Sequence, residues 1–135
     1  MQVICDPNVL VSAAVTPNGV CAQLLVGLSE APQQLIVSPL LLAELRTVLG
    51  RPRFATPPDL VQAFERYLRL IAVEEADPAP SAGGVGSADS KDDYLIRLTL
   101  AAPRRLLVTG DRHLLDLAGP VPVATPRVLL DGLRG

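Results

Sequence analysis

The residues of this chain most able to do chemistry are four acids, each placed where a folded sheet would collect them: Asp6, Glu44, Asp92 and Asp111. Asp6 ends an apolar run at residues 3–5, and Asp111 follows another at 106–108. In an open α/β sheet, ligands bind beyond the carboxyl ends of the strands, near the point where strand order reverses. Carboxylates gathered there repel one another unless they hold a cation. The pattern therefore predicts a metal-dependent enzyme that attacks phosphodiesters.

Two of these acids also have a simpler structural interpretation. Asp6 directly follows a predicted strand, and Asp is a good helix N-cap. The sequence therefore supports a helix cap and a metal ligand equally well at this position. Glu44 lies on a helix face that is mostly apolar, made of Leu40, Leu41, Thr47 and Val48. A carboxylate on such a face is costly unless it pairs with an Arg or binds metal. We favour the ligand interpretation for Glu44.

Helix geometry indicates which of the neighbouring acids near residue 90 can be a ligand. Asp92 and Asp93 point about 100° apart on a helix, so only one of them can face the site. Asp92 lies on the face of Leu95, which should be buried, whereas Asp93 stands four residues before Arg97 and suits a surface ion pair. Asp89 is best explained as a cap with Asp92 at the third helical position. The alternative for the whole segment is an acidic helix start favoured by the helix dipole.

Strand and helix patterns alternate along the chain. Apolar runs predict strands at 2–5, 35–37, 71–73, 106–108 and 121–124. Helical patterns cover 8–14, 20–29, 39–49, 60–70, 112–117 and 126–133, with one more from 89 or 90 to 102. Ser38 and Pro39 form a strong helix start. Alternation of this kind predicts an α/β fold, with a short parallel sheet of four or five strands between helices. Residues 77–88 form a long Pro/Gly/Ser/Ala loop.

Composition narrows the class of protein. A length of 135 residues predicts one domain spanning 1–135, and 49% apolar residues exclude a disordered chain. Aromatic residues make up 3%, which argues against an aromatic base-stacking platform. The net charge of −2 gives no sign of nucleic-acid binding, although a local Arg cluster could still attract phosphates.

Cysteine usage and hydropathy indicate a reducing cytoplasm and no membrane. Cys5 and Cys21 are too few for a disulfide framework or a zinc site. No signal peptide is expected, because Asp6 and Pro7 fall where its apolar region should be. The most apolar stretch, 35–49, is too short and too charged to span a bilayer.

Several motifs together resemble a known family. They are D-P-N-V-L-V-S-A, S-P-L-L-L-A-E-L-R-T-V-L-G-R-P-R-F, D-S-K-D-D-Y-L-I-R-L and L-L-V-T-G-D-R-H-L-L-D-L. In order and spacing they resemble the PIN-domain nucleases, in particular the bacterial toxins of toxin–antitoxin modules. The resemblance covers nearly the whole chain. It implies a three-layer domain whose acidic cluster binds Mg²⁺ or Mn²⁺ and hydrolyses RNA.

The resemblance also implies roles for individual residues. The family's acids fall on Asp6, Glu44, Asp92 and Asp111, and its supporting polar positions fall on Asn8 and Thr109. Pro7 departs from the family, because a Thr or Ser usually stands there and would place a hydroxyl near the metal.

Beside the acids stand residues that could contact RNA. Hard carboxylate oxygens suit Mg²⁺ or Mn²⁺ better than zinc. Arg51 and Arg53 follow the Glu44 helix, and Arg112 follows Asp111, so all three are candidates for holding the RNA backbone. Taken singly, each is more simply a surface charge. The only histidine, His113, is expected at the surface or against a phosphate.

The resemblance further implies a small antitoxin partner that covers the acidic crevice. We expect a homodimer as well, with exposed apolar side chains concentrated at 20–28 and 60–70. Two other functions agree with parts of this pattern. Phosphatases of the haloacid-dehalogenase class need a second Asp where this chain has Asn8, and are discounted. A catalytically weak domain that acts by binding RNA or protein is the remaining alternative.

Overall fold

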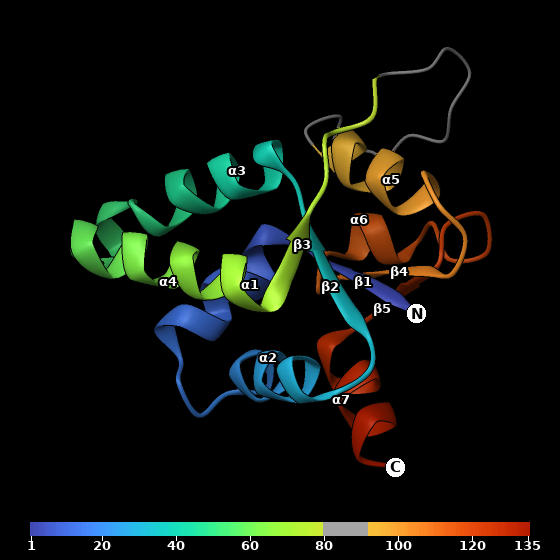
Figure 1. Cartoon of the computed structure of the whole chain (residues 1–135), viewed down its shortest axis with the longest axis horizontal. Helices are drawn as coiled ribbons and strands as arrows, with labels where there is room; N and C mark the ends of the chain where they lie inside the picture. Colours follow the sequence, from blue (N-terminus) through green and yellow to red (C-terminus); the bar gives the residue numbers. More distant parts are fainter. Residues whose placement is uncertain (80–91) are drawn as a thin grey trace.

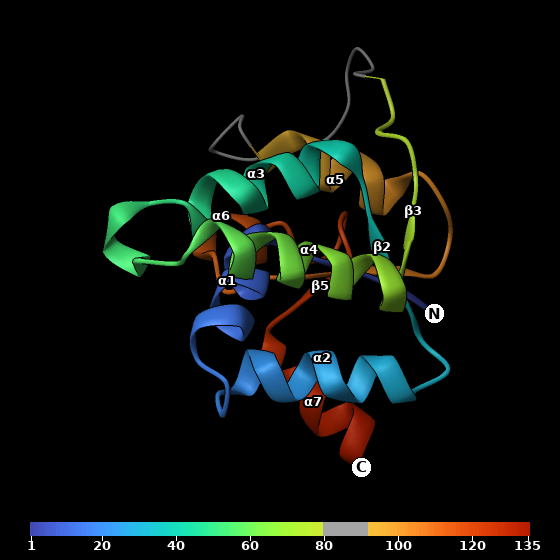
Figure 2. The same ribbon diagram turned by 60° about the vertical axis from the view of Figure 1, so that its left-hand side comes forward.

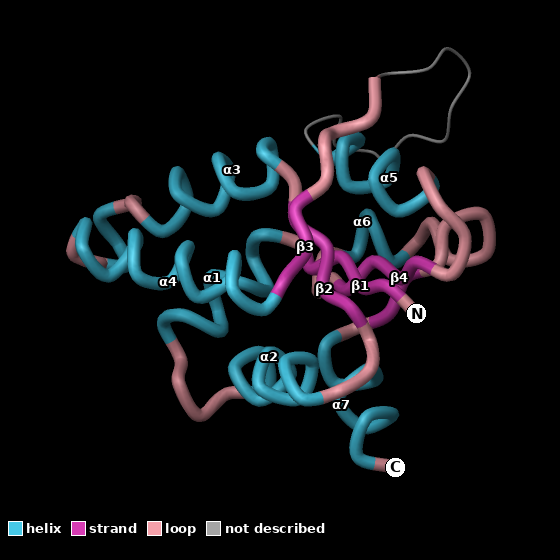
Figure 3. Tube along the Cα trace, viewed as in Figure 1, coloured by secondary structure: helices cyan, strands magenta, loops and turns pink. Residues whose placement is uncertain are grey.

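The fold is built on a five-stranded parallel sheet in the order β3-β2-β1-β4-β5. It comes from a computed structural model that describes residues 1–79 and 92–135. The strands, magenta in Figure 3, are β1 (Gln2–Cys5), β2 (Gln34–Val37), β3 (Ala72–Glu74), β4 (Arg105–Val108) and β5 (Val123–Ala124). The predicted parallel sheet is therefore confirmed, with the larger of the two expected strand numbers.

Helices cover the sheet on both sides. They are α1 (Pro7–Val15), α2 (Val20–Glu30), α3 (Pro39–Leu49), α4 (Pro58–Ile71), α5 (Asp93–Leu100), α6 (Arg112–Leu115) and α7 (Pro126–Arg134), with a short 3-10 helix η1 (Pro52–Phe54). In Figures 1 and 2, α2 and α7 lie below the strands, whereas α5 lies above them. The three-layer α/β architecture is confirmed.

Several helices begin with the same two-residue signal, an oxygen-bearing cap followed by proline. The Ser38 hydroxyl accepts a hydrogen bond from the Leu41 amide at 3.3 Å and starts α3. Thr125 does the same for the Val128 amide at 3.2 Å and starts α7. Proline suits the next position because its missing N–H would have no partner in the first turn. The helix start predicted at residues 38 and 39 is confirmed.

An aliphatic core fills the space between the layers. Ile4, Ile36 and Leu107 on neighbouring strands are fully buried, because helices cover both faces of the sheet. Burying each such side chain contributes roughly 2 kcal/mol. The central strands are thereby fixed in place, and their carboxyl ends become a rigid support for the residues that follow.

Strand order decides which residues meet. β1 lies at the middle of the sheet, with β2 on one side and β4 on the other. The strands that follow β2 and β4 are therefore added at opposite edges of the sheet. Cys5 is paired with Val108, and the Asp6 amide donates to the Val108 carbonyl at 2.9 Å. Asp6 and Asp111 therefore follow adjacent strands at the point where strand order reverses.

Two predicted elements differ from the structure. The described part of the helix expected from 89 or 90 to 102 is Asp93–Leu100, and Asp92 is its N-cap rather than its third residue. The proposed cap Asp89 lies outside the described residues, as do residues 80–88 of the predicted loop. The edge strand is Val123–Ala124 instead of 121–124, because Pro122 has no amide to donate to the ladder.

A buried arginine ties three parts of the chain together. Arg105 is 5% exposed, and its Nη2 donates to both carboxylate oxygens of Glu75 at 2.6 Å. Its Nη1 donates to the Leu98 carbonyl at 2.8 Å, and its Nε donates to the Gln2 side chain at 2.8 Å. These bonds join the segment after β3, the start of β1 and the end of α5.

Exposed apolar side chains are spread over the described surface instead of gathering as expected. Val26, Leu60 and Leu70 lie in the two predicted helical stretches. The other large ones are Met1, Val15, Leu40, Val73, Leu100 and Val128. The expected concentration at 20–28 and 60–70 is therefore wrong.

In the described parts of the chain, no single helix is long and apolar enough to cross a membrane. α1 and α2 pass such a test by length and composition only when joined, and they are bent by 103° at their junction.

Candidate active site

Asp6 is the most buried acid of the candidate site, at 3% exposed. One carboxylate oxygen accepts a hydrogen bond from the Asn8 amide at 3.0 Å, and the other accepts one from the Thr109 hydroxyl at 2.8 Å. Asp6 is thus the N-cap of α1, as its structural interpretation predicted. The cap uses only some of its lone pairs, so capping and cation binding are compatible.

Burial is the main cause that raises the pKa of Asp6. The hydrogen bonds from Asn8 and Thr109 act in the opposite direction, because they stabilise the charged form. The negative charges of Glu44 and Asp111 raise the pKa further. Asp6 is therefore repelled by two carboxylates that are distant from it in sequence. A cation bound beside Asp6 would offset that repulsion.

Thr109 connects the ends of β1 and β4. Its hydroxyl, fully buried, donates to Asp6 and accepts a hydrogen bond from the Asp111 amide at 3.0 Å. The Asp111 side chain accepts from the His113 amide at 2.8 Å and so caps α6. The two strand ends are thus joined by one side chain. Thr109, expected to support the acids, is placed to hold both of them.

Glu44 reaches the same region from the middle of α3. Its Oε2 accepts a hydrogen bond from the Tyr94 hydroxyl of α5 at 2.5 Å. Among the described residues Glu44 forms no ion pair with an arginine, so the alternative of a distant Arg partner is wrong. Nearby Arg46 is exposed and pairs with Glu65 of α4 instead. Glu44 is half-buried and keeps its second oxygen for another ligand.

The surroundings of Tyr94 include Asp92, the fourth predicted acid. Its pKa is raised by burial, then by the hydrogen bond to Glu44 and the charges of Glu44, Asp6 and Asp92. All four predicted acids therefore lie in one electrostatic neighbourhood. Asp92 and Asp93 are both half-buried, so their exposure does not separate them. The choice of Asp92 over Asp93 stays a prediction.

The chemistry of these side chains fits a hard divalent cation. Every candidate donor is a carboxylate oxygen, the kind of ligand that hard cations prefer, and among the described residues no Arg, Lys or His lines the pocket beside Asp6 and Asp111. Within the described residues, however, no three acidic, His or Cys side chains lie close enough to hold one ion. Binding by several acids would need their side chains to rotate toward one another.

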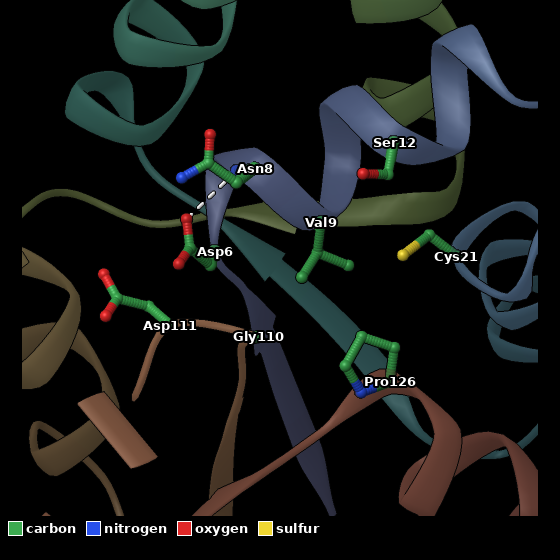
Figure 4. Close-up of a pocket in the computed structure, with 8 residues that line it drawn as sticks. All are labelled: Asp6, Asn8, Val9, Ser12, Cys21, Gly110, Asp111 and Pro126. Atoms are coloured by element: carbon green, nitrogen blue, oxygen red, sulfur yellow. Dashed lines mark hydrogen bonds between the residues drawn. The ribbon is translucent and has the colours of Figure 1, made fainter. Parts of the chain in front are cut away.

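A pocket opens beside Asp6 and Asp111. It has a volume of about 400 Å³ and is lined by Asp6, Asn8, Val9, Ser12, Cys21, Gly110, Asp111 and Pro126. Figure 4 shows the two carboxylates at one end, Ser12 and Cys21 at the other, and Val9 and Pro126 between them. The acids are therefore reachable from a space large enough for part of a nucleotide.

The candidate RNA-contacting arginines do not lie together. Arg112 directly follows Asp111 and is exposed. Arg51 and Arg53 are exposed at η1, at the far end of α3 from its junction with the sheet in Figure 1. The Arg53 guanidinium lies over the Phe54 ring, 4.6 Å from its centre. Arg112 is thus the one of the three beside an acid of the site. His113 is exposed, as expected.

Sequence reasoning missed Tyr94, Ser12 and Cys21. Tyr94 stands two residues after Asp92 on the buried face of α5, and this position was the available signal. Ser12 and Cys21 lie on α1 and α2, where no strand end points to them. Their contribution to the pocket depends on how those two helices pack.

Comparison with known proteins agrees with this geometry. The profile of the PIN domain family matches residues 2–113. A solved structure of VapBC2 from Rickettsia felis, bound to a DNA fragment from its promoter, has a similar fold, with a TM-score of 0.66. The match covers 93% of this chain and 98% of the other at 14% identity. A search of curated proteins found no significant match. The matched profile spans most of the chain, and the protein belongs to the PIN domain family.

Proposed function

We propose that the protein is a metal-dependent endoribonuclease, made of one domain spanning residues 1–135, that hydrolyses RNA phosphodiester bonds. One observation supports this most: acids from four separate elements share one neighbourhood at the ends of β1 and β4. PIN domains are generally nucleases, which agrees with that arrangement.

In this proposal the metal ligands are Asp6, Glu44, Asp92 and Asp111, and the ion is Mg²⁺ or Mn²⁺. When bound, such an ion activates water and stabilises charge on the phosphate. Asp6 and Asp111 present oxygens fixed by Thr109 and by backbone amides. Asn8 lines the pocket and could contact the substrate with its side-chain amide. Arg112 supplies positive charge next to Asp111, where a phosphate would otherwise meet only acids.

A toxin role is the second part of the proposal. The toxin-like motifs and the fold shared with VapBC2 favour a cognate antitoxin protein, and we further propose a homodimer in the cytoplasm. Expression of the chain alone should arrest growth, and co-expression with the neighbouring reading frame should relieve the arrest. Arrest that persists in Asp6→Ala would contradict the toxin role, because it would not depend on the acidic site.

Cleavage of a 5′-labelled single-stranded RNA by purified protein tests the reaction itself. Mg²⁺ or Mn²⁺ should support cleavage, and a chelator should stop it. Asp6→Asn should remove it as well, which excludes a contaminating nuclease.

The alternative is a catalytically weak domain that acts by binding RNA or protein. The observation in its favour is that no three acids of the described residues surround one ion as they stand. RNA binding without cleavage at any metal concentration would favour this alternative.

A further inference from the structure

The pocket beside the acids has two chemically different ends. Asp6 and Asp111 line one end, and Ser12 and Cys21 line the other. Val9 and Pro126 stand between them, from α1 and from the start of α7 (Figure 4). The acidic end is accounted for by the proposed metal chemistry. The Ser12–Cys21 end, called here the neutral end, has no role in it.

The neutral end offers weak polar groups against apolar walls. The Ser12 hydroxyl can both donate and accept a hydrogen bond. Burial raises the pKa of Cys21, and a hydrogen bond with Ser12 opposes this, so the thiol carries no charge at neutral pH. The side chains of Val9 and Pro126 provide apolar surface. This end therefore suits a neutral group that has a flat apolar face and a polar edge.

Charge argues against a phosphate in the same place. Among the residues that the structure describes, the lining of the pocket contains no Arg, Lys or His, and its charged members are Asp6 and Asp111. A phosphate held away from the metal would meet these carboxylates without compensation. A ribose is also a poor match, because its hydroxyls would face the hydrocarbon of Val9 and Pro126.

We propose that the neutral end is a subsite for one unpaired nucleobase, that of the nucleotide next to the scissile phosphate. The inference rests on the proposed ribonuclease function and adds a determinant of its sequence preference. The flat faces of the base contact Val9 and Pro126, and its edge meets the Ser12 hydroxyl. A volume of about 400 Å³ for the whole pocket leaves room for a nucleoside unit beside the acids.

The first test needs neither metal nor cleavage. Adenosine, cytidine, guanosine and uridine are each titrated into the protein while the methyl resonances of Val9 are followed by NMR. We expect the Val9 signals to shift at nucleoside concentrations on the order of 10 mM, and one base to give the largest shift. Ser12→Leu fills the neutral end and should abolish the shift.

The matched control for this test is Ser29→Leu, a substitution of another exposed helical serine that does not line the pocket. It should leave the Val9 response as in the wild type. The absence of any Val9 shift with all four nucleosides would overturn the proposal. An equal response in Ser12→Leu and the wild type would overturn it too.

The second test compares cleavage of an RNA pool with randomised sequence. Wild type should prefer one base at a single position beside the cut, and Ser12→Leu should weaken that preference about tenfold. Cleavage by Ser12→Leu with an unchanged base preference would overturn the subsite. Failure of the wild type to cleave would count against the proposed ribonuclease alone, because nucleoside binding at Val9 still decides the subsite.

Discussion

The acidic site has two halves that are held in different ways. Asp6 and Asp111 follow the ends of β1 and β4, where backbone amides and the buried Thr109 hydroxyl fix their carboxylates. Glu44 comes from α3 and Asp92 from the start of α5, and the Tyr94 hydroxyl of α5 donates a hydrogen bond to Glu44. The strand half is thus set by sheet register, whereas the helix half depends on how two helices lie on the sheet.

This difference has a consequence for preorganisation. Register in a sheet with both faces buried is strongly specified, so the strand half should already have its geometry before any ligand binds. The helix half can adjust, because a side-chain hydrogen bond between helices is worth only about 1 kcal/mol net. A cation would then be met first by Asp6 and Asp111 and enclosed afterwards by Glu44 and Asp92.

The largest effect should come from the strand half. Asp6→Asn can keep the cap through its one amide oxygen, but it removes the charge and the second acceptor that Thr109 uses, so RNA cleavage should fall about a thousandfold. Asp59→Asn, an exposed acid in the first turn of α4, is the control and should cleave like the wild type. Initial rates on a labelled RNA provide the measurement. Equal rates for the two variants would show that Asp6 is only a helix cap.

In the helix half, substitutions of the neighbouring acids Asp92 and Asp93 should affect RNA cleavage differently. Asp92→Asn should lower cleavage about a hundredfold, because it removes one of the proposed metal ligands. Asp93→Asn should change the rate by less than about threefold, because Asp93 points about 100° away from Asp92 around the helix and is not a proposed ligand. The same cleavage assay measures both. The reverse ranking would mean that the helix phase was assigned wrongly.

A smaller effect is expected from the link between α3 and α5. Tyr94→Phe removes the hydroxyl that orients Glu44 and should weaken Mn²⁺ binding about tenfold, measured by isothermal titration calorimetry. The melting temperature without metal should change little, since the ring stays in place. Tyr67→Phe on α4, which contacts Phe64, serves as the control. Equal Mn²⁺ affinities in the two variants would contradict a positioning role for Tyr94.

The smallest effect concerns stability without metal. The pKa of Asp6 is raised in the fold, chiefly by burial, so the folded protein binds a proton there more tightly than the unfolded chain. Stability from this group is then highest below the unfolded pKa, and it is lost as pH rises through the folded pKa. Asp6→Asn carries no charge at this position and avoids that loss, so it should gain stability relative to the wild type as pH rises to neutral.

Denaturant unfolding of both proteins at acidic and neutral pH, with a chelator present, measures this difference. The gap between them should narrow at low pH, where the wild-type carboxyl is protonated. A difference in unfolding free energy that stays constant with pH would mean that the charge of Asp6 does not destabilise the folded protein.

The strand half of the site could be predicted from sequence because local patterns determine it. Asp6 and Asp111 each follow a short apolar run, and the general rule for open α/β sheets places such residues at one edge. Ser38 with Pro39 gave the start of α3 for a similar reason, since cap and proline are neighbours in the chain.

The helix half was less predictable. The face predicted for Glu44 is only partly buried, because Leu40 and Thr47 are exposed, and the partner of Glu44 is Tyr94 and not an arginine. The direction of the Tyr94 hydroxyl depends on how α5 sits over the sheet, which no local pattern specifies. The same holds for Ser12 and Cys21, which meet only because α1 and α2 pack side by side.

The Arg105 network has a consequence for how the sequence can vary. Glu75 stands before residues 80–91 and Leu98 after them, and Arg105 holds both. Asp77 adds a second anchor, because its side chain accepts a hydrogen bond from the Leu40 amide at 2.9 Å. The connection between β3 and α5 is thus closed by contacts outside residues 80–91. Insertions there should be tolerated, because the contacts that hold the two ends of this connection do not involve residues 80–91. This stretch is where the chain could gain new sequence during evolution without displacing Asp92 or Tyr94.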